Sequence, residues 1–336
     1  MIIGIISGLT TCALWGLTFV AARAVAPFSP IDLAVSRYGL FGLVSLLLML
    51  HPSFRPVELS LRRWSVGLAL GGLGYVGYFV SAAFAVGLSG PAIPPLVTGL
   101  MPVILPLIAH LNEKAVAWRR LASPLLLIAS GIAVVNLGTF ADVSSGDRTK
   151  VLLGVGLSFA ALAVWVVCGL ANSAIMRNDE NAPDSLAWTG VQGIGALIGS
   201  ILLLPFTSLS TQTAFTAPQV ETFILWSFLM GFAGSWLATV LWVIAARRLP
   251  LSLAAQLIVA ETIFGLGYGF LFEARWPTLT EAAGAGLQIA GVCLAIAVFT
   301  SSTRNRMGGT NIGALDQVQS SSELSVSTSS KTSTGA

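Results

Sequence analysis

Long apolar runs constrain this chain more than any other feature of its sequence. Such runs recur ten times, near residues 3–25, 30–50, 65–88, 91–111, 121–139, 151–175, 185–205, 222–246, 250–272 and 279–299. About 20 helical residues cross a bilayer core of about 30 Å, and a helix satisfies its own backbone there. Only 9% of the residues are charged, against roughly 25% in a soluble domain. The sequence therefore predicts an all-α membrane protein with ten transmembrane helices.

The basic residues between these runs predict an orientation. Twelve of them fall on the side that holds both termini: Arg55, Arg62, Arg63, Lys114, Arg119, Arg120, Arg177, Arg247, Arg248, Arg304, Arg306 and Lys331. Four fall on the other side: Arg23, Arg148, Lys150 and Arg275. Since Lys and Arg accumulate in cytoplasmic loops, both termini are expected in the cytoplasm of a cell in whose plasma or inner membrane the chain resides. The net charge of +3 is spread over these loops, so nucleic acid is not expected as a partner.

Two halves of the chain resemble each other. Gly4 and Trp15 match Gly154 and Trp165, and Gly131 matches Gly291 at a spacing of 160. Because each half holds five runs, an odd number, the second half would be inserted upside down, as in many secondary transporters. We expect a first repeat over 1–140 and an inverted second repeat over 151–300. The segment 301–336 is rich in Ser, Thr and Gly, and it predicts a disordered cytoplasmic tail.

Several segments resemble the EamA branch of the drug/metabolite transporter superfamily. They are "ALWGLTFVAAR" (13–23), "SPIDLAVSR" (29–37), "MPVILPLIAHLNE" (101–113), "AARRLPLSLAAQLIVAETIFGLGYGFLFE" (245–273) and "GAGLQIAGVCLAIAV" (284–298). The resemblance covers roughly residues 1–300. It implies two EamA-like repeats of five helices, a central cavity between them, and movement of small organic solutes, often outward. The chain departs from the family at Thr262, where a Pro usually follows the Glu.

Glu261 stands alone in an apolar run, at about 16 Å from the cytoplasmic face by helix rise, which is near the bilayer midplane. A charged group at this depth is a candidate functional residue, because it needs a partner, water or a proton. Two readings stay open. Glu261 either binds solute or a proton in a cavity, or braces a neighbouring helix; exposure to lipid is a third, minor alternative.

Arg37 is the basic residue placed well inside a run, about 10 Å below the outer face. It is a candidate counter-ion for Glu261 or for an anionic solute, and snorkelling to the interface is the alternative. Trp15 and Trp165 are repeat-equivalent and lie midway along their runs, where interfacial anchoring does not explain them. They either line a cavity or pack in the core.

Uncharged polar residues within the runs form a second set of candidates. Substrate contact and interhelical hydrogen bonding are both open for Gln256, Tyr78, Gln192, Gln288 and Asn172. Glu113 and Glu273 end their runs on opposite faces, as solvated charges or as gate latches.

Signatures of catalysis and of metal binding do not stand out. The three cysteines are isolated, the two histidines have no ligand spacing, and no catalytic triad is recognisable. No metal and no cofactor is therefore expected, and the protein is not expected to be an enzyme.

The sequence accordingly predicts a secondary transporter that exports a small organic metabolite, amino-acid-like or drug-like, by alternating access. Its partners would be the solute, the bilayer and, as a candidate coupling ion, the proton. An importer or exchanger of the same fold is the alternative, followed by an intramembrane lipid-handling protein.

Overall fold

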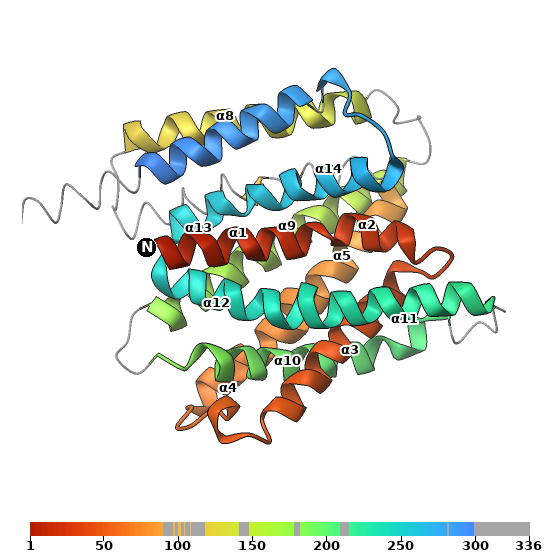
Figure 1. Ribbon diagram of the computed structural model, residues 1–336, viewed down its shortest axis with the longest axis vertical. Helices are drawn as coiled ribbons and strands as arrows, with labels where there is room; N and C mark the ends of the chain where they lie inside the picture. Colours follow the sequence, from red (N-terminus) through yellow and green to blue (C-terminus); the bar gives the residue numbers. More distant parts are fainter. Residues whose placement is uncertain are drawn as a thin grey trace, which may run out of the picture.

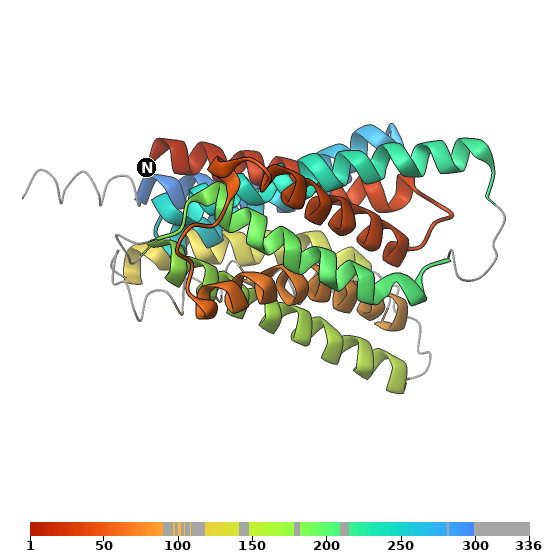
Figure 2. The same cartoon turned by 90° about the horizontal axis from the view of Figure 1, so that it is seen from below.

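A bundle of helices forms the protein, and their axes run side by side (Figures 1 and 2). The computed structural model describes residues 1–89, 97, 100, 101, 104, 108, 118–140, 148–177, 182–208, 215–280 and 282–298. Within this part every regular element is helical, and 5 helices are long and apolar enough to cross a membrane. The prediction of an all-α membrane protein is therefore confirmed.

Helices cover each predicted run within the described part. The first half contains α1 (Ile2–Gly16), α2 (Thr18–Ala24), α3 (Pro30–Leu48), α4 (Leu61–Ala69), η2 (Leu70–Gly77), α5 (Tyr78–Ser89) and α8 (Trp118–Phe140). The second half contains α9 (Arg148–Arg177), α10 (Ser185–Leu203), α11 (Ala217–Gly231), η5 (Phe232–Leu237), α12 (Ala238–Arg248), α13 (Leu251–Leu257), α14 (Val259–Glu273) and a last helix, Ala282–Val298. Short 3₁₀ turns, η1 (Pro52–Phe54) and η3 (Leu204–Phe206), follow α3 and α10. The predicted fourth run, 91–111, and the tail 301–336 lie almost wholly or wholly outside the described residues.

Side-chain caps fix where two central helices begin. The hydroxyl of Ser29 accepts from the backbone N–H of Asp32, whose carboxylate accepts from the N–H of Ser29, and Pro30 follows at the first helical position. Asp184 accepts in the same way from the N–H groups of Leu186 and Ala187 at the start of α10. These caps satisfy N–H groups that have no partner within the helix, so α3 and α10 start at defined residues.

Two runs that the sequence predicts as continuous helices are interrupted. The first breaks at Leu17, between α1 and α2, and the ninth breaks at Ile258, between α13 and α14. Both residues have φ −58°, with ψ −23° and −27°, which is close to 3₁₀ geometry. Neither break is at a Pro or Gly, so the residue pattern contains no sign of it.

Two further runs widen into π-helical turns. These segments are η2 and η5, and their last residues, Gly77 and Leu237, lie 160 positions apart. A π-helical turn leaves backbone carbonyls without their usual partner and is frequent at functional sites. Four irregular segments thus interrupt helices in the interior of the bundle.

At one edge of the bundle α8 crosses the last helix, and Figure 1 shows the two side by side. A methyl group on Gly131 would lie 2.7 Å from the carbonyl oxygen of Gly284, and one on Gly291 would lie 3.0 Å from that of Pro124. Gly131 and Gly291 are 160 positions apart, and so are Pro124 and Gly284. Shifting the partners of one contact by 160 positions, one forward and one back, therefore gives the partners of the other. A two-fold axis between the helices produces such reciprocal contacts.

Candidate functional site

Arg37 projects from α3 into the interior and is only 4% exposed. Its guanidinium donates to the hydroxyls of Ser235 (3.1 Å) and Thr18 (3.2 Å) and to the backbone oxygen of Gly234 (3.1 Å). It also lies over the ring of Tyr38, 4.8 Å from the centroid. Snorkelling, the alternative for Arg37, does not fit this burial.

The irregular segments explain how Arg37 finds these partners. Gly234 and Ser235 belong to η5, where a π-helical turn frees carbonyl groups, and Thr18 is the first residue after the break at Leu17. Buried guanidinium groups need several acceptors to replace water. The π-helical turn of η5 and the residue after the break at Leu17 together provide three acceptors for Arg37.

Glu261 lies in the first turn of α14, directly after the break at Ile258. A negative charge is favoured at a helix N-terminus, so the break creates a suitable position for a carboxylate. The side chain is half-buried, and its backbone oxygen faces Gly16, where a methyl group would lie 3.2 Å from it. On the other side of the break, the carbonyl of Leu257 accepts from the thiol of Cys12 at 3.2 Å. The two broken helices therefore meet at Glu261.

The charges of Arg37 and Glu261 interact electrostatically. The three hydrogen bonds of Arg37 go to neutral groups of α2 and η5, so the arginine is anchored independently of the carboxylate. Glu261 takes part in none of these three bonds. Whether it braces the fold or binds solute or a proton stays a prediction.

Trp15 and Trp165 lie in contact, edge to face, with ring centroids 5.7 Å apart. Trp15 is 7% exposed and also contacts Trp242, at 5.6 Å. Tyr78 stacks on Trp165 at 5.0 Å, so the predicted pair and this predicted tyrosine belong to one aromatic cluster. Trp15 and Trp242 belong to a buried apolar core, and Trp165 packs against it.

A small cavity of about 20 Å³ adjoins this cluster. It is lined by Leu70, Gly74, Tyr75, Met101, Trp165, Cys168, Gly169, Asn172, Gln192 and Trp242. The hydroxyl of Tyr75 donates to the Oε1 atom of Gln192 at 3.0 Å, while the Nε2 atom of Gln192 is buried without a partner. An unpaired buried donor costs about 1–3 kcal/mol, so a group that accepts a hydrogen bond from this atom would be favoured.

Gln256 and Gln288 are fully buried, and neither amide atom of either side chain has a partner. Gln256 lies on α13, one residue before its end. Gln288 lies at the crossing with α8, where its Cγ faces Gly131. The predicted polar candidates are thus divided: Tyr78 joins the aromatic cluster, whereas Gln288 is at the edge of the bundle.

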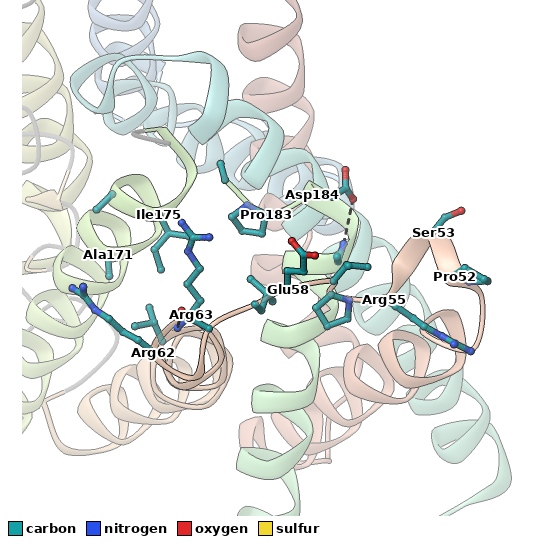
Figure 3. Close-up of a pocket in the computed structure, with 18 residues that line it drawn as sticks. Pro52, Ser53, Arg55, Glu58, Arg62, Arg63, Ala171, Ile175, Pro183 and Asp184 are labelled. Carbon is teal, nitrogen blue, oxygen red and sulfur yellow. Dashed lines mark hydrogen bonds between the residues drawn. The ribbon is translucent and has the colours of Figure 1, made fainter. Parts of the chain in front are cut away.

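A much larger pocket, of about 1020 Å³, opens between α4, α9, α10 and the segment 52–60. Figure 3 shows Arg62 and Arg63 extending from the start of α4 toward Ala171 and Ile175 of α9. None of the predicted site residues in the described part of the chain lines it. Ala171 lines this pocket and the next residue, Asn172, lines the small cavity. The fully buried Trp188 donates its indole N–H to Oδ1 of Asn172 at 2.9 Å.

The predicted gate residues cannot be placed in the same way. Glu113 lies outside the described residues, and Glu273 ends α14 with a side chain that is not described. In the described part no group of three or more His, Cys, Asp or Glu side chains gathers. The expectation of no resident metal or cofactor stays a prediction.

Sequence reasoning missed four residues of the site: Thr18, Tyr75, Ser235 and Trp242. Tyr75 and Ser235 are 160 positions apart, each in a π-helical segment. Extending the repeat alignment would have paired them. No such signal marks Trp242, because position 82 is an alanine.

Comparisons with known proteins agree with the membrane assignment. No family model matches the chain. It is 28% identical to "Inner membrane protein YtfF" of Escherichia coli (strain K12) over 311 residues, which is 88% of this chain and 95% of that protein. A crystal structure that carries no functional description superimposes with a TM-score of 0.70 at 17% identity, covering 89% of this chain and 98% of the other. The chain is thus a membrane protein homologous to an inner membrane protein, and its fold has been solved before.

Proposed function

We propose, from this likeness to an inner membrane protein, that the chain is a secondary transporter of the EamA type. It would export a small organic metabolite by alternating access, through ten helices arranged as two inverted repeats, 1–140 and 151–300. The observation that carries the proposal is the meeting of two broken helices and a π-helical turn at Arg37 and Glu261. Irregular backbone at membrane depth is tolerated where it lines a binding site or is covered by protein, and transporters use such broken helices to bind their substrates.

The symmetric helix crossing supports the two-repeat arrangement. The contacts of Gly131 with Gly284 and of Gly291 with Pro124 are related by the same shift of 160 residues. The ends of η2 and η5 obey that shift as well. Since an inverted duplication relates its halves by a two-fold axis, such reciprocal contacts are expected of it.

Glu261 is the proposed proton-binding group of the cycle. When the site is open to water, or when the positive charge of Arg37 acts on it, the ionised carboxylate is favoured. When the site closes and excludes water, the neutral acid is favoured. A cycle that alternates between these environments would take up a proton on one side and release it on the other.

The large pocket would be the entry from the cytoplasm in this scheme. It opens at the end of the bundle where α4 begins and α9 ends, with Arg62 and Arg63 beside it. Positive charge marks the cytoplasmic side. Under the predicted orientation a solute would pass from this pocket toward the aromatic cluster.

The test uses purified protein in liposomes with an imposed proton gradient. A panel of labelled amino acids and small aromatic cations is screened for flux that requires the protein. We expect the wild type to exchange at least one solute against protons, and Glu261→Gln to reach the membrane folded but to lose the dependence on the gradient.

The direction of the coupled flux separates export from import. Outward movement of solute against inward proton flow supports export, and movement of both in one direction makes the protein an importer. Lipid turnover by the purified protein without solute flux would instead support the lipid-handling alternative. An unchanged rate and pH profile in Glu261→Gln would assign that residue to bracing.

A further inference from the structure

The cavity beside the aromatic cluster contains a hydrogen-bond donor with no acceptor. Gln192 is 1% exposed, and its Oε1 atom is occupied by the hydroxyl of Tyr75 at 3.0 Å. In this orientation the Nε2 atom is the end of the amide left without a partner. The donor belongs to a buried side chain whose oxygen atom already has a partner.

A second amide lines the same cavity in a defined orientation. Oδ1 of Asn172 accepts the indole N–H of Trp188 at 2.9 Å, so the nitrogen end of this amide is the one that remains for other contacts. The cavity therefore offers amide N–H groups rather than acceptors. The rings of Trp165 and Trp242 form its apolar walls.

Charge distinguishes this cavity from the surroundings of Arg37. Among the described lining residues none is charged. Gly74 and Tyr75, on the cavity side, lie 160 positions before Gly234 and Ser235, which hold Arg37. The π-helical segment of the first half thus contacts a neutral amide, that of Gln192, whereas the π-helical segment of the second half contacts the guanidinium of Arg37.

We infer that the Gln192 cavity binds an uncharged oxygen acceptor of the transported solute, such as an amide, carbonyl or hydroxyl group. A free carboxylate is disfavoured, because no cation of the described lining would offset its loss of water. The observed volume of about 20 Å³ holds about one water-sized group. The inference rests on the proposed function, since it assigns part of a solute to the central site.

Cys168 lines the cavity and allows binding to be measured without knowledge of the natural solute. The full-length protein is treated with N-ethylmaleimide, and modification of Cys168 is followed by peptide mass spectrometry. Formamide, formate and methylammonium are added separately at equal concentration as neutral, anionic and cationic probes. We expect formamide to slow the modification and the two ions to leave it unchanged. Saturation-transfer NMR on the same probes gives a second readout that does not depend on thiol reactivity.

Substitutions then assign the effect to one donor. Gln192→Leu should weaken formamide binding about fivefold, the factor for one neutral hydrogen bond of about 1 kcal/mol. Gln288→Leu is the matched control, because this equally buried glutamine lies at the α8 crossing, outside the cavity. Its formamide affinity should equal that of the wild type.

Three results would overturn the inference. The first is that formate or methylammonium binds with the same affinity as formamide. The second is that Gln192→Leu retains full affinity for formamide. The third is that neither readout detects any probe, which would make the cavity a site for structural water. Failure of the transport proposal is distinguishable. Formamide binding that depends on Gln192, in a protein without solute flux, would leave the subsite standing and remove its role in transport.

Discussion

Trp15 and Trp165 contact each other edge to face across the interior, 5.7 Å between ring centroids, although 150 positions separate them in the chain. Their surroundings differ. Trp15 is 7% exposed and packs on Trp242, whereas Trp165 is half-buried and lines the small cavity. Equivalent positions have thus acquired different environments.

This difference predicts unequal effects of truncation. Trp15→Ala should lower the free energy of unfolding by about 3–5 kcal/mol, the usual cost of removing a large buried ring. Trp165→Ala should cost less stability and should alter the modification rate of Cys168 more. Thermal unfolding in detergent and maleimide labelling measure the two effects, with Trp165→Phe as the control that keeps an aromatic wall. Equal losses of stability would assign both rings to packing.

The Arg37 and Glu261 charges can be tested by a double-mutant cycle. Arg37→Met should destabilise the protein by about 3–5 kcal/mol, because it leaves Glu261 and the acceptors on η5 and α2 without their cation. Adding Glu261→Gln should restore part of that loss. Unfolding of the wild type, both single variants and the double variant yields the coupling energy. A value near zero would mean that the two groups act independently.

The crossing of α8 with the last helix predicts symmetric sensitivity. Gly131→Ala and Gly291→Ala should each cost about 1–3 kcal/mol, because the added methyl groups would meet backbone oxygens at 2.7 and 3.0 Å. Gly286→Ala, on the same last helix, meets nothing within 4 Å and should be neutral. Thermal unfolding of the three variants and the wild type measures these differences in stability. A large loss for one crossing glycine alone would contradict the reciprocal contact.

Trp188 is predicted to separate the large pocket from the small cavity. Trp188→Ala removes the fully buried ring, so maleimide should reach Cys168 faster from the large pocket. Trp188→Phe keeps most of the ring and loses only the bond to Asn172, so its effect should be smaller. Labelling in vesicles of each orientation shows the side of entry. An unchanged rate in Trp188→Ala would mean that solutes reach the cavity elsewhere.

The orientation of the chain can be tested with reporter fusions. Reporters placed after residue 116 and at residue 310 should be cytoplasmic, and a reporter after residue 145 should be on the opposite side. The reason is the excess of Lys and Arg on the side that holds both termini. If the reporters at 116 and 145 appear on the same side, the fifth span and the inversion are both wrong.

Composition and hydrophobic run length were sufficient to predict the helical membrane fold. The depths of Arg37 and Glu261 in the bilayer stay predictions. The partners of Arg37 were not predictable, because Thr18 and Ser235 are small hydroxyl residues of ordinary appearance. The breaks at Leu17 and Ile258 occur in apolar sequence without Pro or Gly at the broken position. Tertiary packing determines them, and a single sequence does not report it. Tyr75 is an intermediate case, since the repeat spacing of 160 pairs it with Ser235.

The reciprocal glycine crossing also has a mechanical consequence. At Gly131 and Gly291 the backbone oxygens of Gly284 and Pro124 lie within 3.0 Å of where a methyl group would be, so the two helices have little room to be pushed closer together. If the two halves rock during transport, we expect the distance between these two helices to change little, so that the opposite edge of the bundle swings about their crossing.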